Sequence, residues 1–137
     1  MDDCIFCQIV RGSIPGYKLY EDQNFLAFLD IRPVNRGHCL IIPKQHYVRV
    51  TDMPDDLLAK ELPLVKRIAL AIVEATGIRD FDLLNTNGAP AGQVVFHHHM
   101  HIIPRKTDDG MTFRIDPIEY DHGEQEELVQ KVRKLLK

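Results

Sequence analysis

The chain has 137 residues, 45% apolar and 27% charged, and its 17 Lys and Arg against 20 Asp and Glu give a formal charge of −3 with neutral histidines. This is an ordinary globular composition, so it excludes disordered and fibrous classes, and the length indicates a single domain at 1–137. No apolar run reaches the ~18 to 20 residues of a membrane span, and the acidic first residues are unlike a signal peptide. The charge does not suit binding to a nucleic-acid backbone. We therefore expect a cytoplasmic protein that binds neither a membrane nor a nucleic acid.

Short strands are expected in the first third of the chain. Residues rich in β-formers place them at 17–21, 25–29 and 38–42, and the polar and glycine-containing segments 22–24 and 35–37 supply the turns. Strands joined by short turns predict an antiparallel meander.

The segment 55–76 has the periodicity of a helix that packs on a core. Thr51 or Asp52 is expected as the N-cap, Gly77 as the C-terminal stop, and Pro63 as a kink or a later start. Apolar residues recur there at steps of three and four: Leu58, Leu62, Val65, Ile68, Ala69, Ile72 and Val73.

The last third contains two further strands and a second helix. We expect strands at 82–86 and 94–103, with a loop containing two glycines at 87–92 between them. The segment 124–137 carries an apolar stripe with Lys and Arg late, which predicts a C-terminal helix. Since such stripes usually pack, we expect it to dock on the domain rather than to bind a partner. Together these elements predict an α+β fold of about five strands, one main helix and a C-terminal helix.

Four of the seven histidines lie in the segment 97–101. On a strand, His97, His99 and His101 share one face at ~6.5 to 7 Å spacing, while His98 points to the other face and is expected to replace an apolar residue. Buried imidazoles without partners cost ~1 to 3 kcal/mol each, so three on one face indicate a functional site. Two chemistries fit: a catalytic metal site, or direct attack of a neutral imidazole on phosphorus. The preceding glycine loop favours a phosphate substrate.

The motif around these histidines resembles the signature of the histidine-triad (HIT) superfamily of nucleotidyl hydrolases and transferases, in its Hint-like branch. That signature is His-x-His-x-His followed by two apolar residues, here His97 to Ile103. Similar segments occur from Cys4 to Arg105, so 1–106 corresponds to the family core and 107–137 to a C-terminal extension. The resemblance implies the HIT-like fold and a homodimer whose two sheets join edge to edge.

The resemblance also implies roles for individual residues. His99 would be the nucleophile at the α-phosphorus, His101 would bind the phosphate oxygens, and His38 and His97 would complete the catalytic set. The nucleotide would be bound, besides His99 and His101, by Ile5, Phe6, Ile9 and Phe28 at the base, Asp30 and Ile31 at the ribose, and Thr86, Asn87, Gly92, Gln93 and Val94 near the phosphate.

The implied function is hydrolysis of nucleotide phosphoramidates or other nucleotidyl compounds at the α-phosphate of purine nucleotides, through a covalent nucleotidyl-histidine. The alternatives are a dinucleoside polyphosphate hydrolase, or a nucleotide-binding regulatory protein with residual activity. Two residues depart from the family pattern. Val94 stands where many members carry Ser or Thr, which argues against fast cleavage of phosphoramidates, and His98 stands where an apolar residue is commoner.

The pair Cys4 and Cys7 forms a C-x-x-C motif, which occurs in redox proteins and in zinc sites. A redox pair follows a strand, and this one does not, so zinc is favoured. Tetrahedral zinc needs two further ligands, and His46 and His97 are available. The resemblance implies this set of four as a structural zinc site, with no organic cofactor. The rivals are unmetallated cysteines and a catalytic zinc on His97, His99 and His101. Cys39 is expected in the core.

Overall fold

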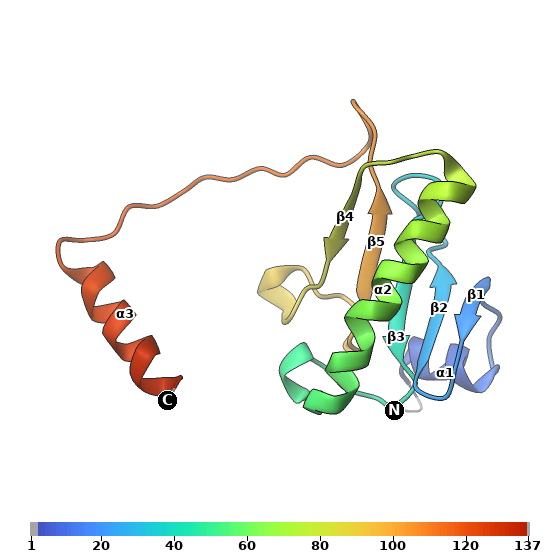
Figure 1. Cartoon of the computed structure of the whole chain (residues 1–137), viewed down its shortest axis with the longest axis horizontal. Helices are drawn as coiled ribbons and strands as arrows, with labels where there is room; N and C mark the ends of the chain where they lie inside the picture. The colour runs from blue at the N-terminus through green and yellow to red at the C-terminus, as the bar shows by residue number, and fades with distance from the viewer. Residues whose placement is uncertain (1–2, 137) are drawn as a thin grey trace.

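The computed structural model describes residues 3–136, which form a five-stranded sheet with a helix on each face and a separate C-terminal helix (Figure 1). The elements follow in the order α1 (Ile5–Arg11), β1 (Lys18–Glu21), β2 (Phe25–Leu29), β3 (Cys39–Pro43), η1 (Val50–Asp52), α2 (Asp55–Thr76), β4 (Phe81–Leu84), η2 (Ala89–Ala91), β5 (Met100–Pro104) and α3 (Glu124–Leu135). The predicted α+β class is therefore confirmed. None of these helices has the length and apolar character that crossing a membrane requires.

All neighbouring strands are antiparallel, in the spatial order β1-β2-β3-β5-β4. The order is a meander as far as β3. Beyond it, β5 inserts between β3 and β4, so that β1 and β4 become the two edges. This insertion places the end of the histidine segment in the middle of the sheet, beside β3, where burial is deepest.

Both faces of the central strands are buried, which explains why β2 and β3 are almost continuously apolar. Alternate residues face two cores. Phe25 and Ile41 pack under α2, whereas Leu26, Phe28 and their neighbours pack against α1. The sheet is thus covered by a long helix on one side and by a short one on the other.

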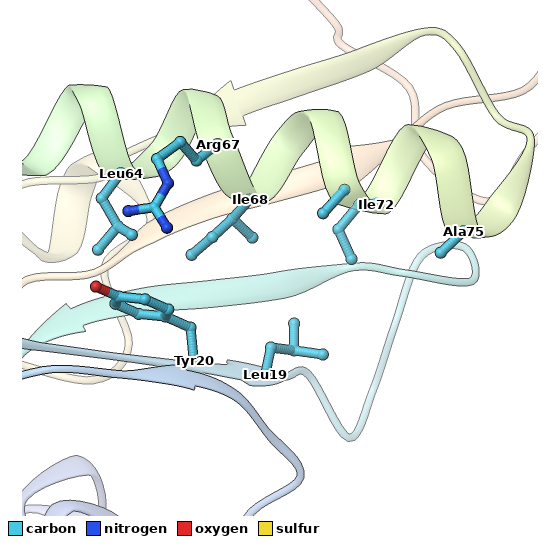
Figure 2. Close-up of a pocket in the computed structure, with 8 residues that line it drawn as sticks. Leu19, Tyr20, Leu64, Arg67, Ile68, Ile72 and Ala75 are labelled. Carbon is cyan, nitrogen blue, oxygen red and sulfur yellow. The ribbon is translucent and has the colours of Figure 1, made fainter.

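The helix α2 runs unbroken from Asp55 to Thr76, through the exposed Pro63, and ends at Gly77 in the left-handed conformation (φ 73°). Its N-cap is Pro54 rather than the expected Thr51 or Asp52, because those two residues lie in the preceding 3-10 turn. Two acidic residues in the first turn suit the helix dipole. Towards the edge strand β1, α2 leaves a groove of about 310 Å³ in which Arg67 lies over the Tyr20 ring at 5.6 Å (Figure 2).

Two expectations from the sequence need correction, and one helix was missed. The strand predicted at 94–103 begins only at Met100, because the preceding backbone is held by loop contacts, such as the 2.6 Å bond from the His98 N–H to the Tyr47 carbonyl, instead of a strand ladder. The helix α1 was not predicted, since seven residues are too few for a clear period. Finally, α3 does not dock on the domain: an extended segment carries it away, and all its described side chains are exposed (Figure 1).

Candidate active site

A cavity of about 520 Å³ opens on the α1 side of the sheet. Its walls come from α1, the end of β2, the glycine loop and the histidine segment. Ten of the residues predicted to bind or act on a nucleotide line it: Ile5, Phe6, Ile9, Phe28, Asp30, Ile31, Gly92, Val94, His99 and His101. The structure therefore brings together residues that are up to 96 positions apart in the chain, counting from 5 to 101.

Of the remaining predicted residues, those near the glycine loop do not line the cavity. The buried Gln93 side chain accepts a bond from the Gly88 N–H at 2.7 Å and donates to the carbonyls of Val48 and Val95 at 2.8 and 3.2 Å. Asn87 accepts from the Val50 N–H at 2.8 Å. These amides hold the loop together. Contacts of Thr86, Asn87 and Gln93 with a nucleotide stay predictions.

The loop itself depends on glycine. Gly88 and Gly92 have φ of 100° and 98°, values that only glycine adopts without strain, and the short η2 turn lies between them. Gly92 lies at the cavity wall beside Val94, which is 83% exposed. The N–H groups of Ala91, Gly92 and Gln93 donate to the carbonyls of Gly88 and Ala89 at 3.0 to 3.1 Å, so these bonds close the turn.

His99 is held in one tautomer by the backbone. Its Nδ1 lies 2.7 Å from the His97 carbonyl oxygen, which can only accept, so Nδ1 carries the proton and Nε2 keeps a lone pair. Burial lowers the pKa of His99, although the bond to His97 opposes that effect. The ring is 7% exposed and packs edge-on against Phe6 at 5.2 Å. His99 is thus a neutral, oriented imidazole in the cavity wall.

A second chain of hydrogen bonds fixes His101. The Val34 N–H donates to Nδ1 of His38 at 3.1 Å, so the proton of His38 is on Nε2, which donates to Nδ1 of His101 at 2.9 Å. His101 must then carry its own proton on Nε2. Burial lowers the pKa of His101 to about 4 and also lowers the pKa of His38, against the attraction of Asp30. The rings of His99 and His101 are 4.9 Å apart, so a lone pair and an N–H donor are neighbours.

Asp30, His38 and His101 also bring one ligand atom each within 4.8 Å of one another. Their nitrogens are already joined by the hydrogen bond just described. We therefore describe this group as a relay that orients His101.

The predicted zinc ligands do come together at the start of α1. Cys4 is the N-cap of α1 and Cys7 lies one turn later, so both sulfurs face the same way. The Sγ of Cys7 lies 3.3 Å from Nδ1 of His46 and 3.5 Å from Nδ1 of His97, and the Sγ of Cys4 lies 3.5 Å from Nδ1 of His97. All four ligand atoms are within 4.8 Å of one another.

This geometry fits zinc. Zn–S bonds of about 2.3 Å and Zn–N bonds of about 2.0 to 2.1 Å at tetrahedral angles put sulfur and nitrogen about 3.6 Å apart. Nε2 of His97 donates to the Pro43 carbonyl at 2.8 Å, which leaves Nδ1 unprotonated and directed at the cysteines. The rival arrangement, one cation on His97, His99 and His101, is not formed among residues 3–136, because His97 turns away from the other two.

His98 faces the opposite side of the sheet, as predicted, where it is 1% exposed. Its Nε2 lies 2.7 Å from Oε1 of Glu61 on α2, and its Nδ1 accepts from the Asn85 amide at 3.3 Å. The same Asn85 nitrogen donates to the His99 carbonyl at 2.9 Å. Sequence reasoning missed Glu61 and Asn85. The available signal was a carboxylate within the apolar stripe of α2, which needs a buried partner such as His98.

Comparisons with known proteins bear on the family of this chain. A family model described as the HIT domain matches residues 11–108. An adenylylsulfatase from Arabidopsis thaliana is 52% identical over 108 residues, which are 79% of this chain but only 55% of that protein. An adenosine 5'-monophosphoramidase from Schizosaccharomyces pombe is 45% identical over 106 residues, 77% of each chain.

Solved structures match over nearly the whole chain. A Streptococcus mutans protein superposes with a TM-score of 0.91 at 38% identity, over 100% of this chain and 87% of that one. A zinc-bound histidine triad family protein from Mycobacterium smegmatis has a TM-score of 0.75 at 40% identity, and the match covers 98% of this chain and 96% of that protein.

Proposed function

The chain belongs to the histidine-triad (HIT) family of nucleotide hydrolases, and we propose that it cleaves its substrates at the α-phosphate through a covalent nucleotidyl-histidine on His99. The observation that carries this proposal is the 2.7 Å bond between Nδ1 of His99 and the His97 carbonyl. It fixes the proton on one nitrogen and leaves the other free to attack phosphorus.

The reaction has two steps. In the first, the lone pair on Nε2 of His99 forms a bond to the α-phosphorus, and the leaving group departs with the electrons of its own bond to phosphorus. A departing amine also takes up a proton from solvent, whereas sulfate leaves as the anion. In the second, water attacks the phosphorus, the P–N bond breaks, its electron pair returns to Nε2, and the water releases a proton. The products are a nucleoside monophosphate, the leaving group and the free enzyme.

The chain's other groups stabilise the equatorial phosphate oxygens. His101, held as an Nε2–H donor by His38, donates to them, and we expect the backbone N–H of Val94, which lines the same cavity, to be a second donor. A neutral donor pre-set by hydrogen bonds needs no reorganisation when charge develops. Positioning and this stabilisation supply the rate.

We propose a purine nucleotide as substrate. The apolar wall made by Phe6, Ile9 and Phe28 can stack on a planar base, and the carboxylate of Asp30 at the cavity rim can accept bonds from ribose hydroxyls. A dinucleoside polyphosphate would use the same attack with another leaving group and remains the alternative enzyme activity.

Val94 bears on the choice of leaving group. It lies at the cavity mouth, 83% exposed, and offers no hydroxyl to protonate a departing amine. Sulfate and phosphate leave as stable anions and need no such proton. We therefore expect adenylyl sulfate to be cleaved faster than adenosine phosphoramidate. A Val94→Ser variant should gain on the phosphoramidate and change little on adenylyl sulfate.

Cys4, Cys7, His46 and His97 fit a structural zinc ion, which with four protein ligands would have no open position for substrate or water. Its contribution would be to clamp α1 to the histidine segment. Holding α1 in this way would fix His97, whose carbonyl orients His99, so a bound metal would affect catalysis through the position of His97.

We also propose a homodimer joined at β4. This strand is an edge of the sheet, and its Phe81 and Leu83 are 40% and 44% exposed. Beside them, Leu62 and Leu70 of α2 are also exposed, and the groove between the two elements has a volume of about 210 Å³. An apolar, unpaired edge strand is a ready template for pairing with a second sheet.

The decisive experiment follows the covalent intermediate. Purified protein is mixed with adenylyl sulfate or adenosine phosphoramidate and examined by rapid quench and intact mass spectrometry. An adenylylated species should form and decay in the wild type and in His122→Ala, which alters an exposed histidine outside the cavity, but not in His99→Ala. Turnover by His99→Ala at the wild-type rate would contradict the proposal. Binding of AMP with neither adduct nor turnover would instead support the regulatory protein.

A further inference from the structure

The C-terminal arm, residues 112–136, makes up nearly a fifth of the described chain and buries none of its residues. It comprises an extended stretch and the helix α3. Nine large apolar side chains are exposed along it: Phe113, Ile115, Ile118, Tyr120, Leu128, Val129, Val132, Leu135 and Leu136. So many large apolar side chains exposed along one segment indicate a protein contact.

The helix α3 needs a contact outside its own chain. Isolated helices shorter than about 12 to 15 residues are marginal in water, and α3 has 12 residues with no side-chain N-cap. Its apolar residues, at steps of one, three and four from Leu128 to Leu136, form one stripe, whereas Gln130 and Lys134 lie on the opposite face. The formation of such a short helix is explained if its apolar stripe packs against another surface.

The path of the arm indicates which surface that is. The arm leaves the end of β5 and runs away from the domain on the side of β4, the edge proposed as the dimer interface (Figure 1). Its ten extended residues reach up to about 33 Å and α3 adds about 18 Å, which together exceed the diameter of about 35 Å of a domain this size. The arm of one copy can therefore cross a second copy joined at β4.

One further observation favours a second copy over an unrelated partner, and another shows that the arm is large enough to form an interface. The Streptococcus mutans structure superposes on 100% of this chain, so the match includes the arm, which has no packing of its own to fix its course. In addition, nine apolar side chains exposing on the order of 100 Å² each supply roughly 900 Å², close to the ~800 Å² that each partner buries in a standard interface.

We propose that this chain forms an arm-exchanged dimer, in which the arm of each copy lies across the domain of the other with the stripe of α3 against it. The inference rests on the homodimer of the proposed function and adds the element that secures it. Each arm contact then occurs twice, since the interface is two-fold symmetric.

The test compares dimer dissociation constants by sedimentation velocity. Relative to the wild type, Val132→Asp on the stripe and a chain truncated after Met111 should each dissociate at least about tenfold more readily. Gln130→Asp adds the same charge to the opposite face of α3 and should change the constant by less than about twofold. Unchanged dissociation in Val132→Asp and in the truncated chain would overturn the proposal.

Cross-linking distinguishes exchange from an arm that folds back. Lysine cross-links are formed in an equal mixture of isotopically heavy and light chains, co-refolded to exchange subunits. About half of the links from Lys131 and Lys134 to the domain should join a heavy to a light chain. Links confined to single chains, or a monomeric full-length protein, would refute the exchanged arm. Adduct formation on His99 is measured separately, so its absence would contradict the proposed hydrolase activity without changing the dissociation constants or the cross-links.

Discussion

The buried pair between His98 and Glu61 predicts an asymmetric mutational response. The two residues are 1% and 4% exposed and lie 2.7 Å apart between the sheet and α2. Since Nδ1 of His98 accepts from Asn85, the imidazole is neutral and its Nε2–H donates to the carboxylate. Removing the imidazole and removing the carboxylate are therefore different perturbations.

Their magnitudes follow from what each variant leaves behind. His98→Leu strands a carboxylate in the core, which should cost about 3 to 5 kcal/mol of unfolding free energy. Glu61→Leu leaves one neutral N–H without an acceptor, which should cost about 1 to 3 kcal/mol. The double variant leaves neither a carboxylate nor an N–H unpaired. Its unfolding free energy should lie within about 1 kcal/mol of the wild-type value, because two apolar groups can replace a buried polar pair at little cost.

The assay is urea unfolding of the four proteins of this double-mutant cycle, with Glu74→Leu at an exposed position of the same helix as the control. The control should change stability by less than about 0.5 kcal/mol. Adenylylation of His99 is measured alongside, because Asn85 also donates to the His99 carbonyl and loses one acceptor when His98 is replaced. Additive single effects, with a coupling below about 0.5 kcal/mol, would refute the reasoning.

Two other sites give direct tests. Cys7→Ser should lose the bound metal, measured by mass spectrometry, and should lower the melting temperature. The control Cys39→Ala, which alters the core away from the four ligands, should keep its metal. Equal metal content in the two variants would exclude the proposed ligand set. Partial burial beside Asp30, His38 and His99 lowers the pKa of His101 to about 4, so its NMR signals should stay constant from pH 8 through the ordinary imidazole pKa of about 6.5 and move only near pH 4. Because the unfolded chain binds this proton at higher pH than the folded one, His101 should also lower stability as pH falls from about 6.5 towards 4; an inflection of its signals near 6.5 would contradict both statements.

The histidine segment shows how one short stretch serves several purposes. His97 turns to the cysteines, His98 to α2 and His99 to the cavity. The bond from His99 to the His97 carbonyl joins the proposed metal site to the proposed nucleophile. A change on either face of the sheet is therefore expected to reach His99 through its own backbone.

Much of the fold could be predicted from local pattern. The helix 55–76 has the predicted bounds, and the predicted strands at 17–21, 25–29 and 38–42 agree with β1, β2 and β3 to within one residue at each end. Long apolar periods and turn residues are local signals, so they can be recognised in the sequence before the fold is known. The position of β5 between β3 and β4 could not be predicted, because strand order depends on which distant edges are free when each strand pairs.

The sequence by itself determined the chemistry available to this protein: alternate imidazoles near a glycine loop, and two cysteines at the spacing of metal ligands. Only the tertiary structure decided how that chemistry is divided, because His97, His98 and His101 take partners far along the chain, whereas His99 bonds to the carbonyl two residues before it. Cys7 is 90 residues from His97, Glu61 is 37 from His98, and His38 is 63 from His101. A buried nitrogen takes whichever partner packing brings within about 3 Å, and local sequence does not record that choice.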